Sequence, residues 1–182
     1  MNNGYTFIGG ERGPWSVVKA TVVRGPGLEP ASRVSAVNEL LPAVPVGASW
    51  VLRSFTSNVR YATRAEVASL KAVQPSVGRP EASRASLIPI RKSEAWWHLA
   101  QDERRRIFEE SSRHTAIGME YLPAVARRLH HSHDLGEPFD FLTWFEFAPE
   151  HEAAFDDLLA RLRASEEWSY VEREVELRLK RV

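Results

Sequence analysis

Residues 121–147 read YLPAVARRLHHSHDLGEPFDFLTWFEF, and this stretch decides the fold that the sequence predicts. The segments Ala126–His133 and Phe139–Phe147 can each form a β-strand. The letters DLGEP lie between the two strands, and they contain the residue types that favour turns. The stretch therefore predicts two consecutive strands joined by a short turn.

The flanking segments extend this pair of strands into a larger unit. An apolar strand over Ser86–Lys92 is followed by a predicted helix, which Ser93 caps and which runs through Phe108. After the pair of strands, a second helix begins near Pro149, and Arg173–Arg181 alternates between apolar and polar residues as a strand does. The order β-α-β-β-α-β is that of a ferredoxin-like unit, an α+β arrangement whose helices cover one face of an antiparallel sheet. The other face would be free for a ligand.

The N-terminal half shows a weaker pattern. Trp15–Arg24 and Trp50–Asn58 are strand candidates, and Thr63–Gln74 has apolar residues at helical spacing. The proline-containing segment 26–45 sustains neither period, so it is expected to be a long ordered loop. This half would be a shortened version of the same unit, with its first helix replaced by that loop.

Composition excludes several classes of function. The 182 residues contain no cysteine, which rules out disulfides, thiolate catalysis and cysteine-ligated metal centres. Basic and acidic residues balance at 24 each, so no overall charge would attract nucleic acid or an anionic membrane. Neither a leader-like N-terminus nor a long apolar run is found, and we expect a soluble, cytoplasmic protein.

A metal or haem would have to be bound by histidine, carboxylate or tyrosine, and the histidines are the first candidates. Taken alone, His114 is a histidine beyond a helix end, which is usually solvated or caps carbonyl groups. His130, His131 and His133 form a histidine cluster with Asp134. His131 and His133 share one face of a strand and could be two metal ligands with the aspartate as a third, or the run could simply belong to the strand and its turn.

Two consecutive arginines stand on the first strand of the pair. Side chains of neighbouring strand residues leave opposite faces of a sheet, so only one of Arg127 and Arg128 can point at a ligand on the open face. The strand pattern alone does not decide which one does so.

Four motifs together resemble one known family. They are LIPIRKSEAWWHLAQDERRRIFEE (87–110), SSRHTAIGMEYLP (111–123), the 121–147 stretch, and LLARLRASEEWSYVEREVELRLKR (158–181). The sequence resembles the chlorite dismutase-like haem proteins, specifically their short-chain, dimeric branch. The resemblance implies a dimeric α+β barrel built from a truncated ferredoxin-like half, residues 1–84, and a haem-binding ferredoxin-like half, residues 85–182.

The resemblance assigns a haem ligand and the residues behind it. His114 matches the proximal axial ligand of haem b. Glu167 matches the acceptor of the other imidazole N–H, a contact that fixes the ring and raises its basicity. Its neighbour Glu166 cannot point in the same direction, and either carboxylate could instead simply be solvated. Lys92 matches a further member of the same hydrogen-bond network.

The resemblance also assigns the opposite side of the haem pocket. Arg127 matches the distal arginine, which leaves Arg128 for a salt bridge or solvent. Gln74 matches the polar partner that orients this arginine. Further pocket or propionate-contacting residues are expected among Trp96, Trp97, Asn58 and Tyr61, although both tryptophans could equally be core residues. His133 stands where the family pattern leads us to expect arginine.

The function that the resemblance implies is the conversion of chlorite to chloride and dioxygen. The Cl–O bond would break at ferric haem to give a ferryl and hypochlorite pair, and Arg127 would hold the hypochlorite until the O–O bond forms. Two alternatives stay open at this point. One is a coproporphyrin-haem decarboxylase of the same superfamily, which would lack a distal arginine, and the other is a haem-binding or haem-sensing protein with incidental peroxidase activity.

Overall fold

The computed structural model describes residues 3–56 and 63–182. Its strands are β1 (Gly4–Gly10), β2 (Trp15–Arg24), β3 (Arg33–Val37), β4 (Ala48–Thr56), β5 (Arg84–Lys92), β6 (Val125–His131), β7 (Phe141–Phe147) and β8 (Val171–Arg181). Its α-helices are α1 (Arg64–Val73), α2 (Glu94–His98), α3 (Gln101–Arg105), α4 (His114–Glu120) and α5 (Glu152–Arg163). A π-helix, η1, covers Arg106–Ser111, and the 3₁₀ turns η2, η3 and η4 cover His133–Leu135, Pro149–His151 and Glu166–Tyr170.

The eight strands form a closed antiparallel barrel in the order β1-β3-β2-β8-β5-β7-β6-β4. The barrel consists of two four-stranded groups, β4-β1-β3-β2 and β8-β5-β7-β6. One junction between the groups is long, because β2 pairs with β8 from Trp15 opposite Arg181 to Arg24 opposite Glu174. The other is short, and in it β4 meets β6 only at Phe55 opposite His131 and Thr56 opposite His130.

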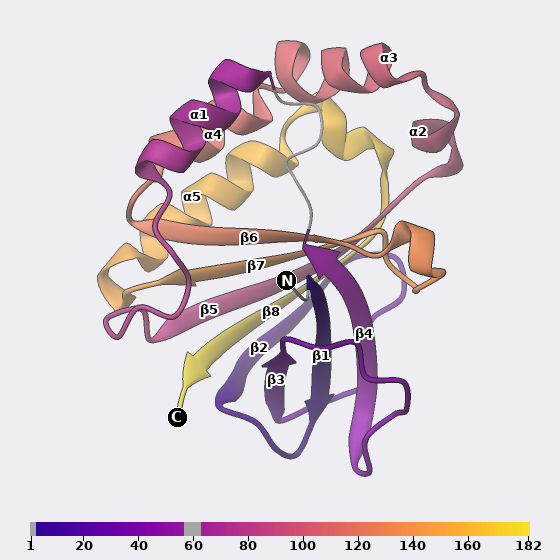
Figure 1. The fold of residues 1–182 in the computed structure, drawn as a ribbon, viewed down its shortest axis with the longest axis vertical. Helices are drawn as coiled ribbons and strands as arrows, with labels where there is room; N and C mark the ends of the chain where they lie inside the picture. The colour runs from indigo at the N-terminus through magenta and orange to yellow at the C-terminus, as the bar shows by residue number, and fades with distance from the viewer. Residues whose placement is uncertain (1–2, 57–62) are drawn as a thin grey trace.

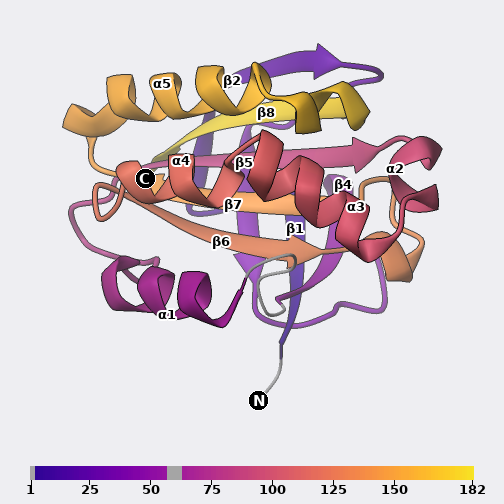
Figure 2. The same cartoon turned by 90° about the horizontal axis from the view of Figure 1, so that it is seen from above.

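The helices lie on one side of this barrel. They cover the group formed by β5, β6, β7 and β8, whereas β1 to β4 lie on the far side without helices over them (Figure 1). Seen from above, α5 runs along the β8 edge and α1 lies beyond β6 (Figure 2). The face of the C-terminal strands that the helices leave uncovered is the inside of the barrel, and core side chains fill it. The expectation that this face is free for a ligand was therefore wrong, because the cavity lies between the strands and the helices.

Two separate cores match this arrangement. The first fills the barrel, and its members include Phe7, Trp15, Trp50, Leu87, Trp144, Val175, Leu177 and Leu179. The second lies between the strands and α5, and its members include Ile88, Phe145, Phe147, Phe155, Leu158, Leu159 and Leu162. The stripe on α5 and the alternation along β8 therefore bury the faces that the sequence pattern indicates.

The N-terminal half differs from the expectation. The segment that was expected to be loop contains strand β3, and a further strand, β1, precedes β2. The connection from β1 to β2 spans only residues 11–14, so the proline-containing segment does not replace a helix between the first two strands. Glycines made β1 hard to recognise, and one of them is required there, because a Cβ on Gly9 would lie 2.0 Å from the Trp50 ring.

The helix expected after Ser93 is broken into three pieces. Ser93 takes the N-cap position of α2, but its side chain makes no capping bond. Arg104 donates to the carbonyl of Trp96 at 2.9 Å and also to that of Trp97, so it satisfies the free carbonyls where α2 ends. Tertiary hydrogen bonds thus override the helical spacing of the apolar residues.

Two strand ends also differ. The first strand of the pair was expected to reach His133, but β6 ends at His131 and His133 begins a 3₁₀ turn. The second strand begins at Phe141 rather than Phe139.

In the part of the chain that the structure describes, no helix has the length and apolar character needed to cross a membrane.

Candidate functional site

A cavity of about 790 Å³, including its open mouth, lies between β5, β6, β7 and the helices. Its lining is formed by Ile88, Ile90, Lys92, Trp96, Phe108, His114, Arg127, Leu129, His131, Phe141, Thr143, Phe145, Leu159, Leu162, Glu167 and Trp168. Apolar and aromatic side chains dominate, and the polar groups among them include two imidazoles, one guanidinium, one ammonium group and one carboxylate.

His114, Glu167 and Lys92 form a continuous polar chain at one end of the cavity. The Nδ1 atom of His114 lies 2.7 Å from Oε2 of Glu167, and the Nζ atom of Lys92 lies 2.7 Å from Oε1 of the same carboxylate. The Glu167 side chain is 6% exposed and that of Lys92 is 3% exposed, so both charges are out of water. The His114 ring is further held against Phe108, at a ring-centroid distance of 4.4 Å and an interplanar angle of 22°.

The contacts with His114 and Lys92 keep Glu167 ionised. Burial by itself raises the pKa of the carboxyl group, but the charges of His114 and Lys92 and their hydrogen bonds outweigh burial and lower the pKa to about 2. Burial lowers the pKa of Lys92, and the carboxylate of Glu167 opposes that change. Because the folded-state pKa of Glu167 lies below its ordinary value, the stabilisation from this group is present at neutral pH and is lost as the pH falls from about 4.5 to about 2.

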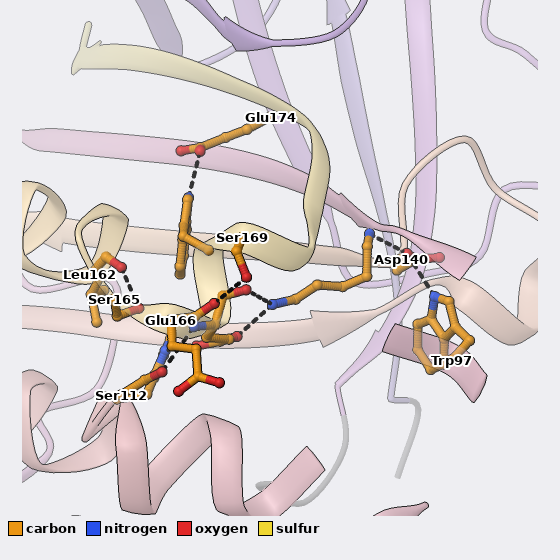
Figure 3. Close-up of polar contacts among 12 residues, drawn as sticks. Trp97, Ser112, Asp140, Leu162, Ser165, Glu166, Ser169 and Glu174 are labelled. Carbon is orange, nitrogen blue, oxygen red and sulfur yellow. Dashed lines mark hydrogen bonds and ion pairs between the residues drawn. The ribbon is translucent and has the colours of Figure 1, made fainter. Parts of the chain in front are cut away.

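The turn η4 holds Glu167 from behind. The backbone N–H of Glu167 donates to the Ser112 hydroxyl at 2.9 Å, and the indole N–H of Trp168 donates to Glu174 at 2.8 Å. Figure 3 shows Ser112 and Glu174 on opposite sides of this turn, with Glu166 pointing away from the network. Glu166 is exposed and Glu167 is buried, so the two adjacent carboxylates do point in different directions.

Arg127 reaches into the same cavity from β6. Its Nη1 atom lies 3.4 Å from Nε2 of His114, which is the imidazole nitrogen that Glu167 leaves free. Burial lowers the pKa of the Arg127 guanidinium, while the charges of Glu167 and Glu109 oppose this effect. The group nevertheless stays protonated at neutral pH, because an arginine starts from a pKa above 12.

Two expectations about the neighbours of Arg127 need correction. Gln74 does not contact the guanidinium, because its Nε2 donates to the backbone carbonyl of Arg127 at 2.5 Å. Arg128 points to the other face of the strand, as the alternation requires, and it stays partly exposed to solvent, but its partner is neutral and no salt bridge is formed with it. Instead, Nη1 of Arg128 donates to the Tyr5 hydroxyl at 2.8 Å, and its guanidinium lies over the Tyr5 ring.

The two tryptophans occupy different places. Trp96 is 1% exposed and lines the cavity, where the Nζ atom of Lys92 lies 4.4 Å from its ring centroid. Trp97 lies outside the cavity, stacks on His133 at 3.6 Å and donates to Asp140 at 3.3 Å. Of the predicted pocket residues, Asn58 and Tyr61 lie outside the described residues.

The histidine cluster does not form a metal site. His131 lines the cavity, whereas His133 bonds Asp140 with its Nδ1 at 2.7 Å. Within residues 3–56 and 63–182, no group of three or more histidine and carboxylate side chains is placed to hold a metal ion.

Sequence reasoning missed several cavity residues. Phe108 and Trp168 flank the His114 ring, and nothing in their local sequence indicates this role. Leu129 and His131 could have been found, because they follow Arg127 at a spacing of two along the strand and so share its face.

Comparison with known proteins agrees with this fold. The family model described as chlorite dismutase matches residues 41–181, so the chain belongs to the chlorite dismutase family, and the family assignment made from the sequence is confirmed. A structure of dimeric chlorite dismutases from Nitrobacter winogradskyi is 53% identical, covers 97% of this chain and 99% of its own, and superposes with a TM-score of 0.91.

More distant relatives agree at a coarser level. The chlorite dismutase of Candidatus Nitrospira defluvii in complex with imidazole is 20% identical, with a TM-score of 0.67 over 98% of this chain and 92% of that one, which shows the shared fold. Chlorite dismutase from Ideonella dechloratans is 34% identical over 86 residues. That match covers 47% of this chain and 28% of the length of the relative.

The hydrogen-bonded side chains of His114, Glu167 and Lys92 give a prediction about stability. Replacing Lys92 by methionine keeps a side chain with an aliphatic stem but removes the ammonium group. Of the two side chains that pair with the buried Glu167 carboxylate, only His114 then remains. Removing one partner of a buried pair usually costs about 3–5 kcal/mol, and we expect a loss of this size in the free energy of unfolding measured with urea at pH 7. Arg91→Met is the matched control, because the adjacent Arg91 pairs with Glu172 at the surface, where ion pairs are worth roughly 0–1 kcal/mol. Equal losses in the two variants would contradict the proposed importance of the buried pair.

Proposed function

We propose that this chain is a haem b-dependent enzyme that converts chlorite to chloride and dioxygen. The observation that carries the proposal is the pairing of two groups in one apolar cavity. His114 presents its Nε2 atom there, with its Nδ1 atom on a buried carboxylate, and Arg127 presents a guanidinium beside it. Family membership and the 53% identity to a dimeric chlorite dismutase support the same activity.

The residues present fit a haem. An imidazole that ligates a metal usually donates its other N–H to a carboxylate, and His114 has this arrangement with Glu167. A chain without cysteine offers no thiolate ligand, which leaves an imidazole such as that of His114, and the apolar walls suit a porphyrin. We infer that His114 would bind the iron, that Glu167 and Lys92 would fix its ring, and that Trp96 would pack against the macrocycle. Haem would supply the redox chemistry at its iron.

One feature of the cavity constrains this arrangement. The guanidinium of Arg127 lies 3.4 Å from the His114 Nε2 atom, so a metal ligated by that atom and the guanidinium cannot share the same position. Ligation therefore requires the Arg127 side chain to rotate away from His114. The hydrogen bond from Gln74 is compatible with such a rotation, because it is made to the main-chain carbonyl of Arg127 and not to the guanidinium.

The role of Arg127 follows from its charge. A guanidinium stays charged at any working pH, so it can attract and orient a small anion without a proton transfer. Because the cavity walls are apolar, this interaction is stronger there than in water. We propose that Arg127 binds chlorite and then holds the oxychlorine fragment in place until dioxygen forms.

The assembly and the two alternatives belong to the same proposal. We propose a homodimer, since the structure at 53% identity is described as dimeric, and light scattering at twice 20.6 kDa would support this. We also propose two ferredoxin-like halves, residues 1–84 and 85–182, and a cytoplasmic location. A decarboxylase of coproporphyrin haem or a haem sensor would not release dioxygen from chlorite, so an oxygen electrode separates them from the favoured activity.

Haem binding should depend on His114. In His114→Ala the axial ligand is lost, and we expect no stable haem complex although far-UV circular dichroism stays unchanged. Titration with haem, followed by the Soret band, measures this. His98→Ala is the control, because His98 is exposed at the end of α2 and should bind haem as the unaltered protein does. Haem binding of full affinity by the His114 variant would move the ligand elsewhere.

Chlorite turnover should depend on Arg127 and not on Arg128. Loss of a charge-assisted contact in a partly dry pocket costs about 1.5–3 kcal/mol, which corresponds to roughly one to two decades in kcat/KM. Arg127→Ala should therefore bind haem, lose this efficiency and release more hypochlorite to a chlorination trap, measured beside oxygen evolution. Arg128→Ala is the matched control, since its guanidinium contacts Tyr5 on the other face of β6. Equal losses in both variants, or full oxygen yield without trapped hypochlorite in the Arg127 variant, would refute the proposed role.

A further inference from the structure

The Glu109 carboxylate caps the N-terminus of α4, the helix that begins with His114. Its Oε2 atom accepts the backbone N–H of Thr115 at 2.8 Å, and its Oε1 atom accepts that of Ala116 at 3.3 Å. The first N–H groups of a helix have no partner within the helix, and a capping side chain normally satisfies them. Arg113 occupies the N-cap position of α4 and gives no such bond, because its side chain makes no capping contact. Glu109, four residues earlier, supplies the cap instead.

The backbone before α4 makes this cap necessary. Residues Arg106–Ser111 form a π-helix, a rare conformation that is frequent at functional sites. Arg113 then adopts a left-handed conformation with φ of 52°, which turns the chain sharply into α4. The helix that follows has only seven residues, and helices this short are not stable by themselves. The direction of its first turn, and with it the direction of the His114 ring, therefore depends on side-chain tethers.

The π-helix and Ser112, the residue that follows it, contact His114 and its partner in two further ways. Phe108, adjacent to Glu109, stacks on the imidazole ring, and Ser112 accepts the backbone N–H of Glu167. The segment thus holds the ring through Phe108, the helix amides through Glu109, and the carboxylate partner through Ser112. Glu109 is the only one of these three that carries a charge, and its charge also acts on the guanidinium of Arg127.

We propose that Glu109 is a positioning residue for His114: its carboxylate bonds fix the first turn of α4, so that Nδ1 of His114 stays on Glu167 and Nε2 stays directed into the cavity. The part of this inference that concerns haem affinity rests on the proposed function. The part that concerns the imidazole does not, because it can be measured without haem.

Three variants test the inference. Glu109→Ala removes both acceptors, and Glu109→Gln keeps one carbonyl oxygen for the Thr115 N–H but loses the charge and the second acceptor. Glu110→Gln is the matched control, because Glu110 lies on the same π-helix and is exposed. The readouts on the haem-free protein are amide hydrogen exchange at Thr115 and Ala116 and the ¹⁵N shifts of the His114 ring. The readouts on the haem complex are the rate of haem transfer to excess apomyoglobin and the iron–histidine stretching band in the resonance Raman spectrum.

We expect Glu109→Ala to speed exchange of the two amides roughly tenfold, the effect of losing a helix cap, and to shift the His114 ¹⁵N signals. The haem complex should lose haem several-fold faster, with an iron–histidine band at lower frequency, and Glu109→Gln should fall between this variant and the unaltered protein. Unchanged exchange, or faster exchange with unchanged ring shifts, would overturn the inference even if Glu109→Ala is unstable, since Glu109→Gln gives the same comparison. If the unaltered protein binds no haem, the proposed function fails, while the ring shifts still decide the role of Glu109.

Discussion

The buried carboxylate of Glu167 is the group on which the rest of the site depends. It lies 2.7 Å from both Lys92 and His114, and the surrounding side chains exclude water from the two charges. A buried carboxylate without partners would be costly, so the folded chain must bring Lys92 from the end of β5 and His114 from the start of α4 to the same turn. This requirement links three segments that lie far apart in the sequence, and it fixes which nitrogen of His114 faces the cavity.

The barrel supplies the frame for this contact. Helices cover only the strands of the C-terminal half (Figure 2). The cavity lies between β5, β6, β7 and this helical layer. The N-terminal strands close the barrel and fill its interior with aromatic residues, among them Trp15 and Trp50. As a result, Arg127 and Arg128 on β6 serve different environments. Arg127 faces the cavity, and Arg128 contacts Tyr5 on the opposite face.

The sequence predicted the parts of the fold that follow a simple period. Strand β2 was expected at its exact bounds, and the buried faces of α5 and β8 follow from their apolar spacing. Strands β1 and β3 could not be predicted in the same way. Strand β1 has glycines at both ends, and β3 has only five residues and lies between proline-containing segments. The break after α2 depends on Arg104 reaching back to carbonyls of Trp96 and Trp97, a tertiary contact that local spacing does not contain.

For the site, the resemblance to the family predicted which residues take part, and the structure shows how their side chains are oriented. His114, Glu167, Lys92 and Arg127 were named from family motifs, and they do converge on one cavity. Composition and spacing could not have found them, because their positions are separated by up to 75 residues. The bond from Gln74 to a main-chain carbonyl was also beyond the motifs, since a motif specifies a residue but not the atom that it contacts.

The central claim is that an ionised Glu167 acts on the iron through the His114 imidazole, and the midpoint reduction potential of the haem complex tests it most directly. Glu167→Gln keeps the size of the side chain but removes its charge, so the imidazole should donate less electron density and the ferric state should become less stable. Spectroelectrochemistry at pH 7 should therefore give a higher midpoint potential in this variant than in the unaltered protein. An equal or lower potential would contradict the claim.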